Sequence, residues 1–226
     1  MKRVDAPELM DADDLPADTY AAVVGDLARV NRVTLAYRPT LDFLARAAAG
    51  GGRLKLLDVG FGDGDMLRRI AAWVARRGVE AELVGVDLNP RSAPAAAAHG
   101  PAALPIAYRT GDYRALAGEG WDVVISSLVA HHMTADELVT FLRFMEAEAA
   151  RGWFVNDLMR HRLAHAGWPV LARAMRWHDI VRHDGAVSIA RSLAPGEWSP
   201  LLRQAGVADA RVVRRFPFRL CVERLR

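Results

Sequence analysis

The amino-acid sequence predicts a doubly wound α/β domain with a mostly parallel, seven-stranded sheet whose last strand is antiparallel. From Leu54 onward, short continuous apolar runs, which are typical of strands buried on both faces, alternate with helical stretches. Residues 54–87 read as strand, glycine turn, helix and strand, which is a βαβ unit. The chain has 226 residues, 52% of them hydrophobic, which favours one sizeable core over two full domains.

The first part of the chain, residues 1–52, is predicted to be a helical cap. Apolar side chains recur at helical spacing from Tyr20 to Val30, and a second helical stretch runs from Pro39 to a glycine run. The central core, residues 53–157, is predicted to hold five strands with helices between them. The strands are expected at 54–59, 82–87, 106–109, 121–129 and 152–157. The helices are expected at 66–77, at 91–99, and from a capping box formed by Thr134 and Glu137 to Ala150.

The rest of the chain breaks this alternation. Residues 158–196 show no clean period, so we expect a substrate lid inserted between the fifth and sixth strands. Residues 197–226 close the domain with a short helix that stops at Gly206 and a hairpin of strands at 210–217 and 218–225.

Charge and hydropathy argue against two classes of partner. Basic residues exceed acidic ones by three, 30 against 27. The six arginines of residues 211–226 alternate with apolar residues, as on the solvated face of strands, and lack the basic and aromatic interleaving of a nucleic-acid surface. The apolar stretches are far shorter than the roughly 18 residues of a membrane helix. We therefore expect no nucleic-acid partner and no membrane span.

The chain's N-terminus and its cysteine content predict a cytoplasmic protein. The first residues become acidic where a secretory signal would be apolar. The single cysteine, Cys221, has no intrachain partner for a disulfide. The sequence leaves the oligomeric state open.

A glycine turn between the first strand and its helix is the first sign of chemistry. Gly60, Gly62 and Gly64 stand at alternate positions, where they allow a tight turn and close approach of a ligand to the backbone. The dinucleotide fingerprint would need a small residue at Asp65, so that motif does not match. The turn also carries three acids, Asp58, Asp63 and Asp65. A pair of unit charges about 4 Å apart is worth about 4 kcal/mol at a dielectric near 20, so these acids favour a cationic or zwitterionic ligand over a pyrophosphate.

Two further acids follow the next strands. Asp87 ends the second strand, where an acid can accept both ribose hydroxyls, although such an acid is often only a cap for the next helix. Asp112 follows the third strand and could bind an adenine amino group, with Tyr113 or Leu88 against the ring. The alternative is an ordinary turn aspartate.

Four segments in this order and spacing, Leu57–Asp65, Val84–Pro90, Gly111–Asp112 and Trp121–Met133, resemble the successive motifs of class I S-adenosylmethionine (SAM)-dependent methyltransferases. The resemblance covers about residues 54–157 and implies a Rossmann-like fold with SAM as cofactor. It implies that Asp58 and the backbone of Gly60 and Gly62 hold the methionine part, Asp87 the ribose and Asp112 the adenine. The other residues expected at the cofactor site are Phe61, Gly64, Asp65, Met66, Leu88, Tyr113 and Ser127.

Paired histidines mark the substrate side. His131 and His132 follow the fourth strand, and a neutral imidazole there could take the proton of a phenol, whose pKa lies near 10. We favour His132 slightly as the base, the alternative being a structural pair. Six of the seven histidines lie between 131 and 183, but no carboxylate or cysteine spacing completes a tetrahedral set with His161 and His165, so we expect no metal.

The predicted lid contributes apolar and polar candidates. Trp168, Trp177 and Met175 would suit an apolar cover over an aromatic acceptor, with ordinary packing as the alternative. Residues 182–192 and 196–198 resemble a stretch in bacterial small-molecule methyltransferases, some of them associated with type III polyketide synthases. The candidates for the substrate wall are Tyr37, Arg38, His183 and Arg191.

The resemblance to these methyltransferases implies O-methylation of a small phenolic, resorcinol-like or quinol-like acceptor. C-methylation of a quinone or polyketide ring, a non-catalytic nucleotide-binding scaffold and an RNA methyltransferase are the alternatives. The absence of an added RNA-binding module in the sequence argues against the last.

Overall fold

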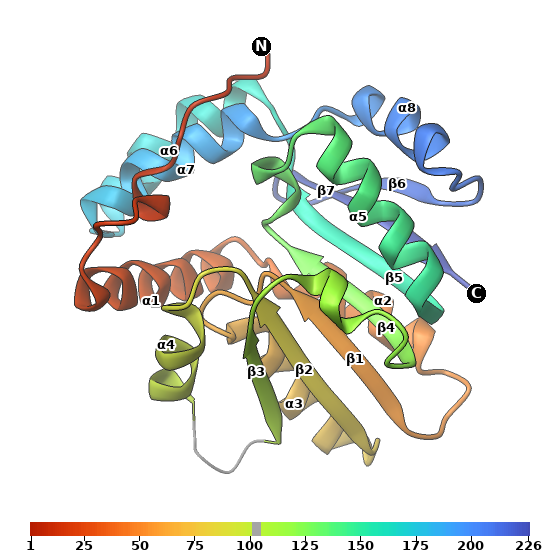
Figure 1. Ribbon diagram of the computed structural model, residues 1–226. Coiled ribbons are helices and arrows are strands. Elements are labelled where there is room, and N and C mark those ends of the chain that lie inside the picture. Colours follow the sequence, from red (N-terminus) through yellow and green to blue (C-terminus); the bar gives the residue numbers. More distant parts are fainter. Residues whose placement is uncertain (101–104) are drawn as a thin grey trace.

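The computed structural model describes residues 1–100 and 105–226, and its centre is a seven-stranded sheet in the order β3-β2-β1-β4-β5-β7-β6 (Figure 1). The strands are β1 Leu54–Val59, β2 Ala81–Asp87, β3 Ile106–Thr110, β4 Trp121–Ser127, β5 Ala149–Leu158, β6 Arg211–Arg215 and β7 Arg219–Leu225. Strand β1 pairs in parallel with both β2 and β4, whereas β7 runs antiparallel to β5 and β6. The predicted doubly wound fold is confirmed.

Helices cover both faces of the sheet, as expected for strands that are apolar on both sides. Helices α2 (Tyr37–Ala47) and α3 (Asp65–Arg77) pack on one face, in a core cluster with Leu56 and Ile125. Helices α5 (Ala135–Glu148) and α8 (Pro195–Ala205) cover the other, with Leu57 and Val124. Helix α4 (Ser92–His99) lies at the β3 edge. Because successive side chains of a strand point to opposite faces of the sheet, each central strand contributes residues to both cores.

A third layer of helices lies beyond the carboxyl ends of the central strands. Helices α1 (Ala17–Val33), α6 (Arg162–Ala174) and α7 (Asp179–Arg191) share an apolar cluster built around Trp168 (Figure 1). Trp177 stacks on Trp168 with 5.5 Å between ring centroids. A Cβ atom at Gly185 would lie 2.1 Å from the Trp168 ring, so only glycine lets α7 approach α6 this closely.

The lid region is more regular than its sequence pattern predicted, since residues 158–196 contain α6 and α7. The sequence of helix α7 shows no clear helical period because the helix is buried on more than one side. Val181 and Ile189 join the apolar cluster, while Asp184 and Ser188 bind the N-terminal segment. The N-cap residues of α6 and α7 are both histidines. His161 accepts a hydrogen bond from the amide of Leu163, and His178 accepts one from the amide of Ile180. Histidine is a rare cap, so the usual start signal was absent.

Two predicted boundaries are shifted at the join of α5 and β5. The helix ends at Glu148 and the strand begins at once at Ala149, where the sequence indicated a helix to Ala150 and a strand from 152. The other central strands and the terminal hairpin lie close to their predicted places.

The N-terminal segment, residues 1–16, runs along α7 before the chain enters α1 (Figure 1). The amide of Val4 donates to the carbonyl of Ala190, and the amides of Leu9 and Met10 donate to the two oxygens of Asp184, each at 2.9 Å. A short 3-10 turn, η1 (Leu9–Asp11), follows from these contacts. None of the described helices is long and apolar enough to cross a membrane.

Candidate active site

A cavity of about 640 Å³ lies between the carboxyl ends of the central strands and the layer formed by α1, α6 and α7. This volume falls in the range of about 300–1,000 Å³ that is common for small-molecule sites. Its lining includes the last residues of four parallel strands, namely Val59, Asp87, Ser127 and Leu158. Open α/β folds bind their ligands at this edge of the sheet.

The glycine turn forms one end of the cavity. Gly62 has a φ of +54°, and a Cβ atom added there would meet nothing within 4 Å, so its backbone is open to a ligand. Gly60 also lines the cavity but is packed from behind, since a Cβ atom would lie 2.3 Å from Val129. Gly64 lies outside the lining and packs against the ring of Tyr108. The turn therefore presents backbone at Gly60 and Gly62, while Gly64 serves the packing.

Three carboxylates give this end of the cavity its charge. Asp58 is buried, its Oδ1 has no hydrogen-bond partner, and burial together with the charges of Asp65 and Asp87 raises its pKa well above the usual range. Asp65 accepts from the Tyr37 hydroxyl at 2.7 Å and from the Asn31 amide at 3.0 Å. A cationic ligand would relieve the electrostatic cost of holding these acids together.

Asp87 is fixed by the backbone around it. Its two oxygens accept from the amides of Gly62 and Asn89, each at 2.8 Å, and burial raises its pKa. Each carboxylate oxygen has a second lone pair free, so the turn contact with Asn89 and a ribose contact are compatible. Asp87 does not cap the next helix, because α4 begins at Ser92 and its N-cap residue is Arg91.

Asp63, the third acid of the turn, contributes less charge than its sequence position suggested. It pairs with Arg68 and with His99, so its charge is largely neutralised within the protein. The anionic end of the cavity is therefore made by Asp58, Asp65 and Asp87.

The remaining predicted cofactor residues divide into those that reach the cavity and those that do not. Phe61, Met66, Leu88, Tyr113 and Ser127 line it. The side chain of Asp112 does not: it caps the 3-10 turn η2 (Tyr113–Leu116) by accepting from the Arg114 amide at 2.8 Å and forms an ion pair with the Arg114 guanidinium. This is the turn role that the sequence left open as the alternative.

The opposite end of the cavity is an apolar chamber. Its walls come from the N-terminal segment and from the three helices of the outer layer. The side chains that line it include Met10, Val23, Leu27, Trp168, Leu171, Val181 and Ile189. Of the predicted lid residues, Trp168 reaches the chamber, Trp177 packs behind it, and Met175 is exposed.

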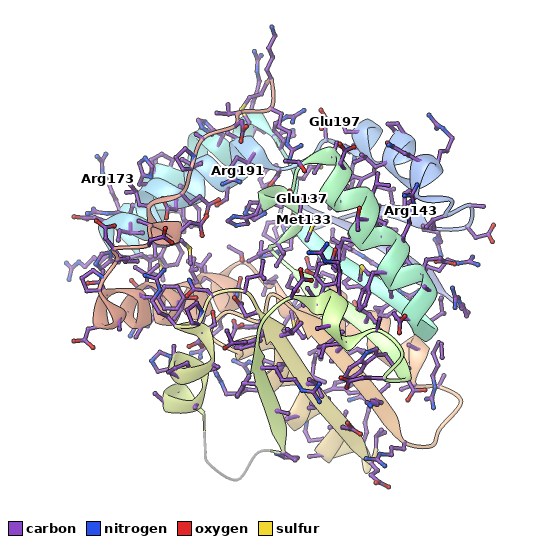
Figure 2. The ribbon with its side chains drawn as sticks, viewed as in Figure 1. Met133, Glu137, Arg143, Arg173, Arg191 and Glu197 are labelled. Carbon is purple, nitrogen blue, oxygen red and sulfur yellow. The ribbon has the colours of Figure 1, made fainter. Side chains whose placement is uncertain are left out.

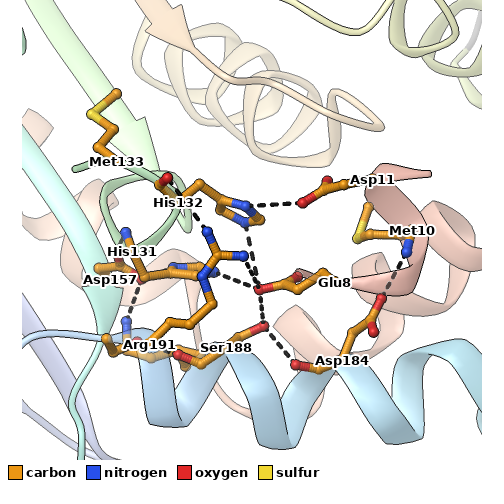
Figure 3. A network of polar contacts seen from close by, with 12 residues as sticks. Glu8, Met10, Asp11, His131, His132, Met133, Asp157, Asp184, Ser188 and Arg191 are labelled. Carbon is orange, nitrogen blue, oxygen red and sulfur yellow. Dashed lines mark hydrogen bonds and ion pairs between the residues drawn. The ribbon is translucent and has the colours of Figure 1, made fainter. Parts of the chain in front are cut away.

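A polar cluster on the cavity wall joins the loop after β4 to the N-terminal segment (Figure 3). His131, in the 3-10 turn η3 (Ala130–His132), is buried; its Nδ1 lies 2.7 Å from an oxygen of Asp157 and its Nε2 lies 3.5 Å from Glu8. Burial alone would lower the pKa of His131, but the charge of Asp157 and the contact with Glu8 raise it to about 9. His131 is therefore a cation at neutral pH.

His132 sits beside this pair and faces the cavity. Its Nδ1 lies 3.3 Å from Asp11 and its Nε2 lies 3.8 Å from Glu8, and its side chain is 30% exposed. The hydroxyl of Ser188 donates to Glu8 at 2.8 Å, which holds that carboxylate in place. Burial raises the pKa values of Glu8 and Asp11, but the two histidines more than offset this and leave both values lowered.

Sequence reasoning missed Glu8, Asp11 and Asp157. The N-terminal acids were considered only as a charge-rich segment, and nothing local indicates that they meet the histidine pair. Asp157 is the next-to-last residue of the buried strand β5. An acid at the end of a strand indicated a site residue at Asp87, and the same pattern indicates one at Asp157. Glu8, His131 and His132 bring donor atoms within 4.8 Å of one another, a spacing that a metal ion could bridge. While His131 is protonated, however, both of its ring nitrogens are donors and neither can bind a metal.

Comparison with known proteins identifies the family. Residues 56–150 match the family model described as a methyltransferase domain. Over 159 residues the chain is 34% identical to a ubiquinone biosynthesis O-methyltransferase of Cereibacter sphaeroides, a match that covers 68% of this chain and 60% of that protein. The chain contains a methyltransferase domain. It spans about 60% of the length of the curated relatives it matches.

Solved structures of methyltransferases share the fold. Human N-acetylserotonin methyltransferase, solved with SAM, has a TM-score of 0.68 at 16% identity, covering 99% of this chain and 60% of that one. Magnesium protoporphyrin IX methyltransferase from Synechocystis, solved with SAH, has a TM-score of 0.57 at 16% identity, covering 96% of this chain and 91% of that one.

The four side chains predicted for the substrate wall of this methyltransferase lie outside the described cavity lining. Tyr37 instead supports Asp65, Arg38 is exposed, and His183 is half-exposed beside Asp184. Arg191 lies at the end of α7 that faces the loop carrying Met133 (Figure 2), where its Nη1 is 3.8 Å from Glu8. Arg191 thus contacts the polar cluster without lining the cavity.

Proposed function

We propose that this methyltransferase binds SAM at the anionic end of the cavity and transfers its methyl group to a hydroxyl oxygen of a small phenolic or quinol-like acceptor held in the apolar chamber. The observation that carries the proposal is that one cavity is lined by the carboxylates of Asp58, Asp65 and Asp87, by apolar side chains of the outer helical layer, and by His132. A cationic cofactor, an aromatic acceptor and a proton acceptor would each find complementary surroundings there.

The residues at the anionic end fit this cofactor. Asp58 and Asp65 complement a sulfonium and an ammonium, and the unpartnered Oδ1 of Asp58 and Oγ of Ser127 are buried acceptors that a ligand could satisfy. Asp87 would accept from the ribose hydroxyls. We assign the adenine contact to Leu88 and Tyr113, because Asp112 is tied to Arg114.

When bound, the cofactor supplies a methyl group on a positively charged sulfur that leaves as a neutral thioether. The protein's contribution is then to hold the acceptor oxygen in line with that methyl group, at about 3–3.5 Å, which can supply about 7–11 kcal/mol of the rate enhancement. The apolar chamber would orient the aromatic ring and exclude water from the reacting oxygen.

We assign the proton of the acceptor hydroxyl to Nε2 of His132. Asp11 at Nδ1 favours the tautomer in which Nε2 is free to accept. His131 is excluded from this role, because a histidine whose pKa is raised to about 9 already carries its proton at neutral pH. We assign His131 a structural role, which keeps Glu8 and Asp157 together in the wall of the site.

The substrate class is supported by two observations. The chamber is lined by Trp168 and aliphatic side chains, which suits a flat apolar ring. The Cereibacter relative is named a ubiquinone biosynthesis O-methyltransferase, and transfer of a methyl group to oxygen is the reaction proposed here.

The test is a screen of phenols, quinols and amines with isotopically labelled SAM, read by mass spectrometry and followed by NMR of any product. We expect a labelled methoxy group on a phenolic or quinol-like acceptor. A methyl group on ring carbon would replace O-methylation by C-methylation. SAM binding in calorimetry without turnover of any acceptor would favour a non-catalytic scaffold, and a preference for NAD over SAM would overturn the proposal.

A further inference from the structure

Arg219 at the start of β7 is a buried charge without a counterion. Its side chain is 1% exposed, yet it forms part of the cavity lining. In the described chain no carboxylate lies within ion-pair distance of its guanidinium. Burial lowers the pKa of Arg219. A guanidinium nevertheless stays protonated in proteins, so the charge persists inside the protein.

The hydrogen bonds of Arg219 are few and neutral. Nη1 donates to Oδ1 of Asn156 and Nη2 donates to Oγ1 of Thr34, each at 3.3 Å, and Nε has no partner. A guanidinium has five donors, and its strongest contacts are short bidentate bonds to an anion. A fully buried arginine held only by two long neutral bonds lacks the partner for which this side chain is suited.

The position of Arg219 points to the cofactor end of the cavity. The register pairs it with Leu158 at the carboxyl end of β5, and its contact with Thr34 brings it to the end of α1, one turn from Asn31. Asn31 binds Asp65, and its own Oδ1 is a buried acceptor without a partner. Unpartnered acceptors on Asn31 and Asp58 and an unpartnered donor on Arg219 therefore line the same cavity.

Such a set of atoms is complementary to an amino acid. Acceptor oxygens suit an ammonium group, and a guanidinium suits a carboxylate. We propose that Arg219 binds the carboxylate of the methionine part of SAM. This inference rests on the proposed function, because it assumes that SAM occupies the cavity.

The test compares SAM with decarboxylated SAM, which keeps the sulfonium and the ammonium but lacks the carboxylate. Calorimetric titration of the wild-type protein should give at least tenfold weaker binding of the decarboxylated compound. In Arg219→Met, binding of SAM should weaken at least tenfold while binding of decarboxylated SAM changes less than about threefold. Arg219→Lys keeps the positive charge but loses the paired donors of the guanidinium. Its affinity for SAM should therefore lie between those of the wild type and Arg219→Met.

Arg215→Met is the matched control. Arg215 stands opposite Arg219 on the neighbouring strand and its Nε also lacks a partner, but it does not line the cavity. Its removal should leave the ratio of the two affinities unchanged. If Arg219→Met does not fold, the wild-type comparison and Arg219→Lys still decide the question.

The outcomes separate this inference from the proposed function. Failure of the wild-type protein to bind SAM would overturn the function itself. Strong SAM binding with no discrimination against the decarboxylated compound, or equal loss of both in Arg219→Met, would overturn the role of Arg219 alone. If the substitution instead weakens a carboxylated phenol relative to the plain phenol, the carboxylate belongs to the acceptor and the assignment to SAM is wrong.

Discussion

The carboxylate of Asp157 binds His131 twice: one oxygen accepts from the backbone amide of His131 at 2.8 Å, and the other lies 2.7 Å from its ring Nδ1. Both residues are almost fully buried. This double contact fixes the loop after β4 and keeps the imidazole protonated, which separates the roles of two neighbouring histidines. His131 stabilises the wall of the cavity, and His132, which also lines it, is the histidine to which we assign the proton of the acceptor (Figure 3).

Replacing His132 by glutamine should lower kcat by a factor of about 10²–10⁴, the usual contribution of a general base. The affinity for SAM should change little, because the ion-pair contacts of His132 are with Glu8 and Asp11 and not with the acids to which we assign the cofactor. The measurement is kcat and SAM affinity of His132→Gln against His165→Gln, a matched change outside the polar cluster. Unchanged turnover of His132→Gln between about pH 6 and pH 9 would refute the base assignment.

The pair of His131 and Asp157 should make stability depend on pH. The folded pKa of His131, about 9, lies above its ordinary value of 6.5, so the pair stabilises the fold fully below pH 6.5 and this contribution is lost as pH rises through about 9. Urea unfolding at several pH values across this window should show the free energy of unfolding falling as pH rises. In His131→Gln the slope should be smaller, and an equal slope in both proteins would contradict the buried ion pair.

Replacing Asp87 by alanine should weaken SAM binding at least tenfold. The change removes the proposed acceptor for the ribose hydroxyls and also the acceptor for the amides of Gly62 and Asn89. Asp87→Asn keeps one acceptor oxygen and should bind SAM with intermediate affinity. Calorimetry with SAM measures both, and wild-type affinity in Asp87→Ala would remove the ribose assignment.

Replacing Gly185 by alanine should destabilise the outer helical layer by about 1–3 kcal/mol, the usual cost of overpacking. The new methyl group would collide with the rigid ring of Trp168, which itself lines the apolar chamber. We expect a lower unfolding temperature and a higher KM for the acceptor, with SAM affinity unchanged. Gly196→Ala on α8, where a Cβ atom meets nothing within 4 Å, is the control and should leave all three quantities close to wild type.

The sequence by itself determined the sheet and the anionic end of the cavity. Both depend on local patterns: apolar runs form strands, the glycines of the turn allow backbone to face a ligand, and an acid that ends a parallel strand, such as Asp87, must lie at the binding edge. Because parallel strands align their carboxyl ends, the order of motifs along the chain was enough to bring Gly62 and Asp87 within hydrogen-bond distance.

Only the tertiary structure decided which side chains complete the site. Glu8 and Asp11 reach the histidine pair because Asp184 of α7 binds the N-terminal segment, and Arg219 reaches the cavity because the last strand turns back beside β5. These contacts join segments that are far apart in the chain, so no periodic pattern in the sequence predicts them. Their partners are chosen by burial, since a charge taken out of water is stable only where the fold supplies an opposite charge or leaves room for a ligand that does.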